Sequence, residues 1–181
     1  SVILEYRSFV NKLVFPLDIL PVNLVLAGLV TEAVGLVIFL AGLLAVRHSI
    51  PESAIWLPLL LIPQVLLAAG LGWLLSATGV FVRDLGQLIG FLLTLWFFLT
   101  PIGYEESKFA SLPGPVGTIL SMNPILILVR GYRTILLENH APWMAAHAPA
   151  GLLWLWGLSI LVAVLGYGWF NRLRKNFADV V

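Results

Sequence analysis

Four long apolar stretches fill most of the chain, and polar turns or one longer mixed segment separate them. They occupy residues 22–46, 55–81, 82–101 and 151–171. An α-helix rises about 1.5 Å per residue and the hydrocarbon core of a bilayer is about 30 Å thick, so about 20 apolar residues can cross it. The pattern therefore predicts an all-α integral membrane protein with four transmembrane helices, of which the third is the shortest.

Prolines refine the predicted helix boundaries. Pro58 falls in the first turn of the second stretch, where proline is tolerated, whereas Pro63 lies deeper and predicts a kink. Pro16 and Pro21 precede the first stretch and predict a short helix, an elbow and then the span. We expect residues 1–21 to form a cytoplasmic segment ahead of the membrane.

The segment between the third and fourth stretches has a different pattern. Asn123 is a favoured N-cap residue, and Pro124 suits the first helical position. The helix that begins there is about 20 Å long, too short to span, and it carries Arg130 and Arg133 on one face. A full span would bury both arginines at a cost of several kcal/mol. Residues 113–138 are therefore expected to form a re-entrant or interfacial helical hairpin.

The distribution of lysine and arginine predicts the orientation. The side that holds both termini has six of these residues, and the other side has four. By the positive-inside rule both termini are cytoplasmic and the hairpin faces outward. The six are Arg7, Lys12, Arg83, Arg172, Arg174 and Lys175, and the four are Arg47, Lys108, Arg130 and Arg133.

Composition fits a lipid environment and excludes several functions. Hydrophobic residues make up 60% of the chain and charged residues 10%, against about a quarter charged in soluble domains. A net charge of +1 leaves no large basic face for nucleic acid. Cysteine is absent, which excludes disulfides, thiolate metal sites and cysteine nucleophiles.

No catalytic or metal-binding pattern is found. The three histidines are scattered through predicted loops, so no metal site is expected. There is no Gly-rich loop ending in Lys-Ser or Lys-Thr, and hence no Walker-type ATP site. We therefore expect no enzymatic activity in this chain, and any ATP hydrolysis would take place on another subunit.

Glu32 is the one ionisable residue well inside a predicted span. One interpretation is a proton or cation site, as in an ion-coupled carrier. The other is a polar contact to a neighbouring helix or subunit. A proton-coupled carrier would normally have several intramembrane carboxylates or histidines, and this chain has one, which favours the contact.

The third stretch has one face of aromatic and uncharged polar residues, with spacings of four, three and four. This face consists of Gln87, Phe91, Thr94 and Phe98, and the aromatics Trp96, Phe97 and Tyr104 lie towards its outer end. Such a face suits a conduit for sugars, since sugar rings stack on aromatic rings and amides and hydroxyls offer hydrogen bonds. Core packing with an interfacial aromatic belt is the alternative. Gly86 and Gly90 form a small-xxx-small pair that would allow close helix approach.

Two cytoplasmic features have a structural and a functional interpretation. At the turn before the third stretch, Asp84 complements the positive end of the following helix, while Arg83 and Asp84 together could contact a cytoplasmic partner. The segment around Lys12 is amphipathic and proline-broken. It is either an interfacial anchor or a docking helix that a cytoplasmic motor pushes.

Five phrases in register resemble the membrane permeases of ABC-type exporters for O-antigen, capsule and teichoic acid. They are residues 12–21 (Lys-Leu-Val-Phe-Pro-Leu-Asp-Ile-Leu-Pro), 80–87 (Val-Phe-Val-Arg-Asp-Leu-Gly-Gln), 99–104 (Leu-Thr-Pro-Ile-Gly-Tyr), Asn123-Pro124 with Tyr132-Arg133, and 170–179 (Phe-Asn-Arg-Leu-Arg-Lys-Asn-Phe-Ala-Asp). Family members are longer at the N-terminus by an amphipathic helix and two spans. The resemblance thus implies that residues 1–181 form a single permease domain that corresponds to the C-terminal two thirds of such a protein.

The resemblance also implies partners and roles. Two permease copies would form a channel in the bacterial cytoplasmic membrane for a lipid-linked glycan, and two cytoplasmic ATPase subunits would bind ATP and Mg²⁺. The third stretch would line the pore, and the hairpin with Arg130 and Arg133 would lie near the exit. The ATPase-coupling region would include Arg7, Lys12, Phe15 and Pro16. The alternatives are a permease of the same fold for a drug or lipid, an ion-coupled carrier that uses Glu32, and a membrane scaffold without transport activity.

Overall fold

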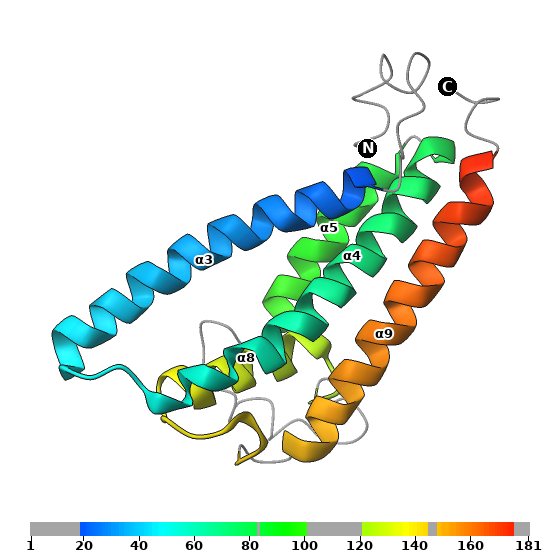
Figure 1. Cartoon of the computed structure of the whole chain (residues 1–181). Coiled ribbons are helices and arrows are strands. Elements are labelled where there is room, and N and C mark those ends of the chain that lie inside the picture. Colours follow the sequence, from blue (N-terminus) through cyan, green and yellow to red (C-terminus); the bar gives the residue numbers. More distant parts are fainter. Residues whose placement is uncertain (1–18, 83, 101–120, 145–147, 176–181) are drawn as a thin grey trace. The chain divides into compact units, whose positions relative to one another are not determined.

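The computed structural model describes residues 19–82, 84–100, 121–144 and 148–175 (Figure 1). Within these ranges the chain is all-helical and contains no strand, which confirms the predicted class. The α-helices are α3 (Ile19–Arg47), α4 (Leu57–Phe81), α5 (Leu85–Leu99), α8 (Pro124–Leu136) and α9 (Ala148–Leu173), with short 3-10 helices η1 (Glu52–Trp56) and η2 (Pro142–Met144).

Three helical segments in the described ranges are long and apolar enough to cross a membrane. They are Ile19–Arg47, Glu52–Phe81 and Pro149–Leu173, and they contain the first, second and fourth predicted spans. The third prediction corresponds to α5, which has 15 residues and is therefore about 22 Å long. Three membrane-spanning helices are thus supported, and a crossing by α5 stays a prediction.

Pro21 and Pro58 both lie in the first turn of a helix, where the backbone N–H that proline lacks would have no partner within the helix. α3 begins at Ile19, so Pro21 lies in its first turn; the elbow predicted at this residue is wrong, because the helix already includes it. Pro58 is the second residue of α4, as predicted. Pro63 lies inside α4, which runs through it from Leu57 to Phe81 as one helix.

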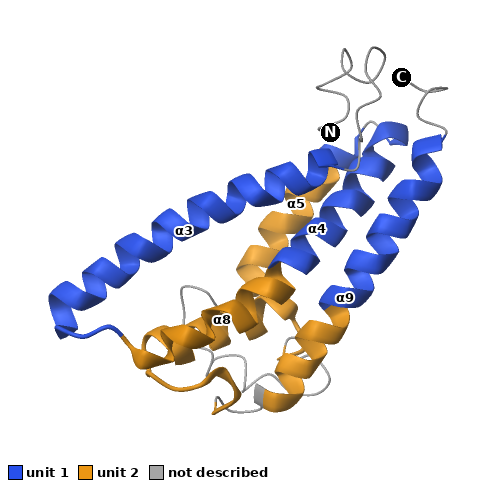
Figure 2. Ribbon diagram, viewed as in Figure 1, with its two compact units in different colours: residues 1–50, 65–86, 159–181 blue, residues 51–64, 87–158 orange. Residues whose placement is uncertain are grey.

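The described part of the chain divides into two compact units (Figure 2). The first unit contains residues 1–50, 65–86 and 159–181, and the second contains residues 51–64 and 87–158. The helices α4 and α9 each contribute to both units, as does α5, whose first two residues belong to the first unit and whose remainder belongs to the second. The single permease domain predicted for residues 1–181 stays a prediction.

In the first unit, α4 packs against the C-terminal half of α9. Ala77, Val80 and Phe170 form a buried apolar cluster, which Trp73 and Leu173 flank. The Trp73 ring also meets the ring of Tyr167 edge-on at 5.1 Å between centroids. The indole N–H of Trp169 donates to the Thr78 hydroxyl at 3.2 Å. Aromatic side chains and one hydrogen bond therefore fix the register of these two helices.

Along α3, by contrast, Pro21 is the one buried residue. Its side chain lies beside Gly72 of α4, where a Cβ on the glycine would be 3.4 Å from Pro21 Cβ. Large apolar side chains elsewhere on α3, such as Val30 and Ile38, are exposed. Apolar exposure on this scale suits a helix surrounded by lipid or by other membrane helices.

Candidate functional site

The helix α5 has two faces with different surroundings. Every residue of the predicted polar and aromatic face is exposed, and Phe91 and Phe98 expose 69% and 68% of their surface. On the opposite side, Ile89 and Trp96 are partly covered, and Thr100, just after the helix, is buried. The predicted face therefore points away from the rest of the unit to which α5 belongs.

The indole of Trp96 anchors α5 to the start of α8. Its Nε1–H donates to Asn123 Oδ1 at 3.0 Å. Because Trp96 lies about 180° around the helix from the exposed face, it belongs to the anchored side of α5. Phe97, in contrast, is exposed and meets Phe98 edge-on at 5.8 Å between ring centroids.

Asn123 closes a cyclic network at this anchor. Its Oδ1 also accepts from the Ile125 amide at 3.0 Å, which makes it the N-cap of α8 with Pro124 at the first position, as the sequence predicted. Its Nδ2 donates to Thr100 Oγ1 at 2.9 Å, and that hydroxyl donates to the Trp96 carbonyl at 2.9 Å. Each of the three side chains has a hydrogen-bond partner in the cycle, so the C-terminal end of α5 is anchored to the start of α8.

A second hydrogen bond joins α9 to the chain just before α8. The indole N–H of Trp154 donates to the carbonyl of Met122 at 3.0 Å, one residue before the N-cap. The ends of α5, α8 and α9 thus meet at residues 122 and 123 within the second unit.

The C-terminal end of α8 is fastened to η1 by a serine. The Ser53 hydroxyl donates to the Ile135 carbonyl and also lies 3.0 Å from Asn139 Oδ1, which accepts from the Ser53 amide at 3.1 Å. Asn139 has a positive φ of 56°, a conformation that asparagine tolerates better than most residues. It directs the chain away from α8 and presents its side chain to η1.

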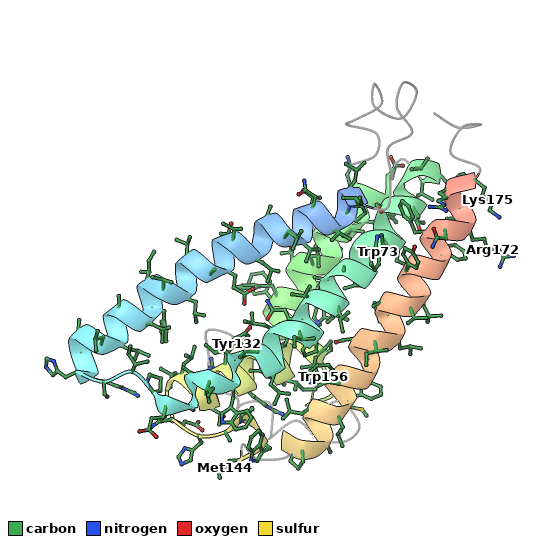
Figure 3. All side chains as sticks on the ribbon, in the orientation of Figure 1. Trp73, Tyr132, Met144, Trp156, Arg172 and Lys175 are labelled. Atoms are coloured by element: carbon green, nitrogen blue, oxygen red, sulfur yellow. The ribbon has the colours of Figure 1, made fainter. Side chains whose placement is uncertain are left out.

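The middle of α8 is held against α4. The Tyr132 hydroxyl donates to Gln64 Oε1 at 2.8 Å (Tyr132 is labelled in Figure 3). One residue earlier, Gly131 lies so close to Leu60 that a Cβ would be 2.7 Å from the leucine Cδ1. The helix is thus tied at its start, middle and end, and most of its apolar side chains are buried.

The two arginines of α8 lie on this fixed helix. Arg130 and Arg133 are both partly buried. Burial lowers the pKa of the Arg130 guanidinium, because desolvation penalises the charged form. Because the contacts of α8 fix this helix within the second unit, they also fix the place of the two positive charges that it carries.

Other predicted site residues have less structural information. Asp84 is exposed and immediately precedes α5, where a carboxylate complements the positive helix end. Glu32 lies partly buried on α3. The predictions for Arg7, Lys12, Phe15, Pro16, Arg83 and Tyr104 fall outside the described residues, as does the first part of the predicted hairpin.

No group of three or more metal-ligating side chains occurs among residues 19–82, 84–100, 121–144 and 148–175. The sequence reasoning missed the roles of Thr100 and Ser53, because each acts through a partner more than 20 residues away. The capping signal at Asn123 was the available clue to the first of these networks.

The sequence is similar to a known family of membrane transporters and to two of its curated members. The model of the ABC-2 type transporter family matches residues 2–137. An O-antigen export system permease protein RfbA from Myxococcus xanthus is 27% identical over 184 aligned residues, covering 100% of this chain and 67% of its own length. The protein of the same name from Klebsiella pneumoniae is 26% identical and covers 96% of this chain and 64% of its own length. The chain thus spans about two thirds of these relatives, and it belongs to the ABC-2 type transporter family.

Proposed function

We propose that this chain is the membrane part of an ATP-driven exporter that moves a lipid-linked, O-antigen-like polysaccharide across the bacterial cytoplasmic membrane. The observation that carries the proposal is the similarity, over at least 96% of the chain, to two proteins named as O-antigen export permeases. Membrane subunits of this family are generally non-catalytic and work with a separate ATPase subunit. ATP and Mg²⁺ would accordingly bind to that partner.

The exposed face of α5 is the proposed wall of the glycan pathway. Two copies of the permease would bring two such faces together around the sugar chain. Phe91 and Phe98 would stack on sugar rings, and the Gln87 amide would exchange hydrogen bonds with hydroxyls. The Thr94 hydroxyl donates to the Gly90 carbonyl at 2.8 Å, so it would act towards a sugar as an acceptor.

The fixed helix α8 supports this arrangement. It anchors the C-terminal end of α5 through Asn123, while the N-terminal end, after Asp84, has no tie of this kind in the described residues. A push from the ATPase on the segment of Lys12 and on the turn of Asp84 would therefore move the free end of α5 more than its anchored end. Arg130 and Arg133 would lie near the exit.

Complementation tests the proposal. The protein, together with an ATPase partner, is produced in a strain that lacks its own O-antigen exporter. We expect surface polysaccharide to return and the ATPase to co-purify with the permease, with lipid-linked sugar bound. Recovery of the ATPase with no polysaccharide at the surface, and with export of a drug or lipid instead, would assign the chain to another transport class.

A further inference from the structure

A continuous stripe on α9 changes from aliphatic to cationic along the helix. It consists of Leu161, Leu165, Gly168 and Arg172, at spacings of four, three and four, and Lys175 follows three residues later. Leu161 and Leu165 expose 54% and 57% of their surface, and the last three are also exposed. All five belong to the first unit, on the side of α9 opposite its buried residues Ala163, Gly166 and Phe170.

The length of the stripe matches one leaflet. From Leu161 to Arg172 the helix rises about 16 Å, and half of the hydrocarbon core is about 15 Å thick. An acyl chain that lies along Leu161 and Leu165 would therefore bring its headgroup level with Arg172.

Gly168 leaves a notch between the aliphatic and the cationic parts. A Cβ placed on this glycine would meet nothing within 4 Å apart from its two chain neighbours and the nearby backbone of its own helix, so no neighbouring helix fills the space. A chain methylene or the glycerol backbone of a lipid fits such a notch without displacing any side chain.

Two exposed cations, Arg172 and Lys175, stand at the cationic end of the stripe. Arg172 lies in the last turn of α9 and Lys175 lies two residues beyond its end at Leu173, and the two are labelled on the same side of the chain in Figure 3. Arg174 lies about 200° around the helix axis from Arg172, on the other side. A phosphate between Arg172 and Lys175 would accept one hydrogen bond from the guanidinium and one from the ammonium group. The negative, carbonyl end of the helix in turn stabilises the two cations at this position.

Because aliphatic side chains, an open glycine and two cations follow one another along the stripe, we infer that it is a binding site for one anionic phospholipid. The phosphate lies between Arg172 and Lys175, the glycerol region lies at Gly168, and one acyl chain covers Leu165 and Leu161. The inference does not depend on which substrate the protein transports. A zwitterionic phospholipid would fit the apolar part equally well, but the positively charged nitrogen of its headgroup would be repelled by the two cations.

Native mass spectrometry on the full-length complex tests the site. The protein is purified in detergent and titrated with phosphatidylglycerol or phosphatidylcholine, and the lipid bound per permease is counted. We expect phosphatidylglycerol to bind more tightly. Arg172→Gln and Lys175→Gln should each weaken its binding by about fivefold, which corresponds to one cation near a membrane surface. Gly168→Leu should weaken it too, although it changes no charge.

Two controls separate a built site from general electrostatics. Arg174→Gln removes the same charge from the other side of the helix end, and its phosphatidylglycerol binding should stay close to that of the unaltered protein. The melting temperature of each variant in phosphatidylcholine should also be unchanged, which shows that the fold is intact. Equal binding of the two lipids, equal effects of Arg172→Gln and Arg174→Gln, or no effect of Gly168→Leu would each overturn the inference.

Discussion

The backbone of Gly166 in α9 packs directly against the carbonyl group of Gly70 in α4. A Cβ on Gly70 would lie 2.6 Å from the backbone carbonyl of Val162 and from the amide nitrogen of Ala163. No side chain therefore separates the two helices at this point. Apolar side chains gain little by leaving lipid, so close backbone contact of this kind is a main source of helix association in membranes.

We predict that Gly166→Ala destabilises the protein by about 1–3 kcal/mol, because the added methyl group would overlap the Gly70 carbonyl and push α9 away from α4. The measurement is the melting temperature of the purified protein in detergent. Gly168→Ala is the matched control, since a Cβ there meets nothing within 4 Å and alanine is the better helix former. Equal melting temperatures for the two variants would contradict the close contact.

The sequence predicted the helices better than the contacts between them. Long apolar runs indicate α3, α4 and α9 within a few residues, because the bilayer requires their length and composition. The same reasoning selected Gly86 and Gly90 as a close-approach pair, yet a Cβ on either meets nothing within 4 Å in this chain. The spacing of two glycines in the sequence does not show whether a neighbouring helix packs against them, so it cannot predict the contact by itself.

The anchor of α5 shows a similar limit. Capping is local, so the sequence was sufficient to predict Asn123 as an N-cap. The bond from Trp96 to the same amide joins residues 27 apart, and no pattern in the chain indicates it. The sequence therefore grouped Trp96 with the residues of the pathway, whereas the structure places its indole on the anchored side.

Asn123→Ala should lower stability by about 2–3 kcal/mol. It removes the N-cap, worth about 1 kcal/mol, and leaves the buried Thr100 hydroxyl and the Trp96 indole without their side-chain partner. Thermal unfolding of the purified protein gives the change. Asn123→Ser is the comparison, because serine keeps the cap but does not reach Trp96, so its loss should be smaller. A loss as large for serine as for alanine would show that the cap contributes little and that the bonds to Trp96 and Thr100 account for the effect.

Replacing Glu32 distinguishes an exporter driven by a separate ATPase from an ion-coupled carrier. On the proposed function, Glu32→Gln should lower the melting temperature modestly and leave glycan export largely intact, because the partly buried side chain serves a structural contact. Surface polysaccharide of the complemented strain is the measurement. Thr31→Val is the control, since Thr31 is the neighbouring polar residue on α3 and its hydroxyl donates to the Ala27 carbonyl of its own helix. Complete loss of transport with normal membrane insertion would favour the carrier.

Removal of the exposed rings of α5 should impair transport without affecting the fold. We expect Phe91→Ala combined with Phe98→Ala to reduce surface polysaccharide by about tenfold or more, because stacking on each ring is worth about 1 kcal/mol and both side chains are largely exposed. Membrane insertion, followed by immunoblotting, should be unchanged. Leu92→Ala, an exposed apolar change on another side of α5, should leave export intact. Equal export from all three proteins would remove this face from the pathway.

Cross-linking tests whether the same face meets a second copy. The chain has no cysteine, so a single introduced thiol reports one position. We expect Thr94→Cys to give a disulfide-linked dimer on mild oxidation in membranes, because Thr94 lies between Phe91 and Phe98 on the face that would line a shared channel. Leu92 is also exposed but lies about 200° around the helix, so Leu92→Cys should give no cross-linked dimer. A dimer from Leu92→Cys and none from Thr94→Cys would mean that the aromatic face of α5 points into lipid, and a glycan could not then pass along it.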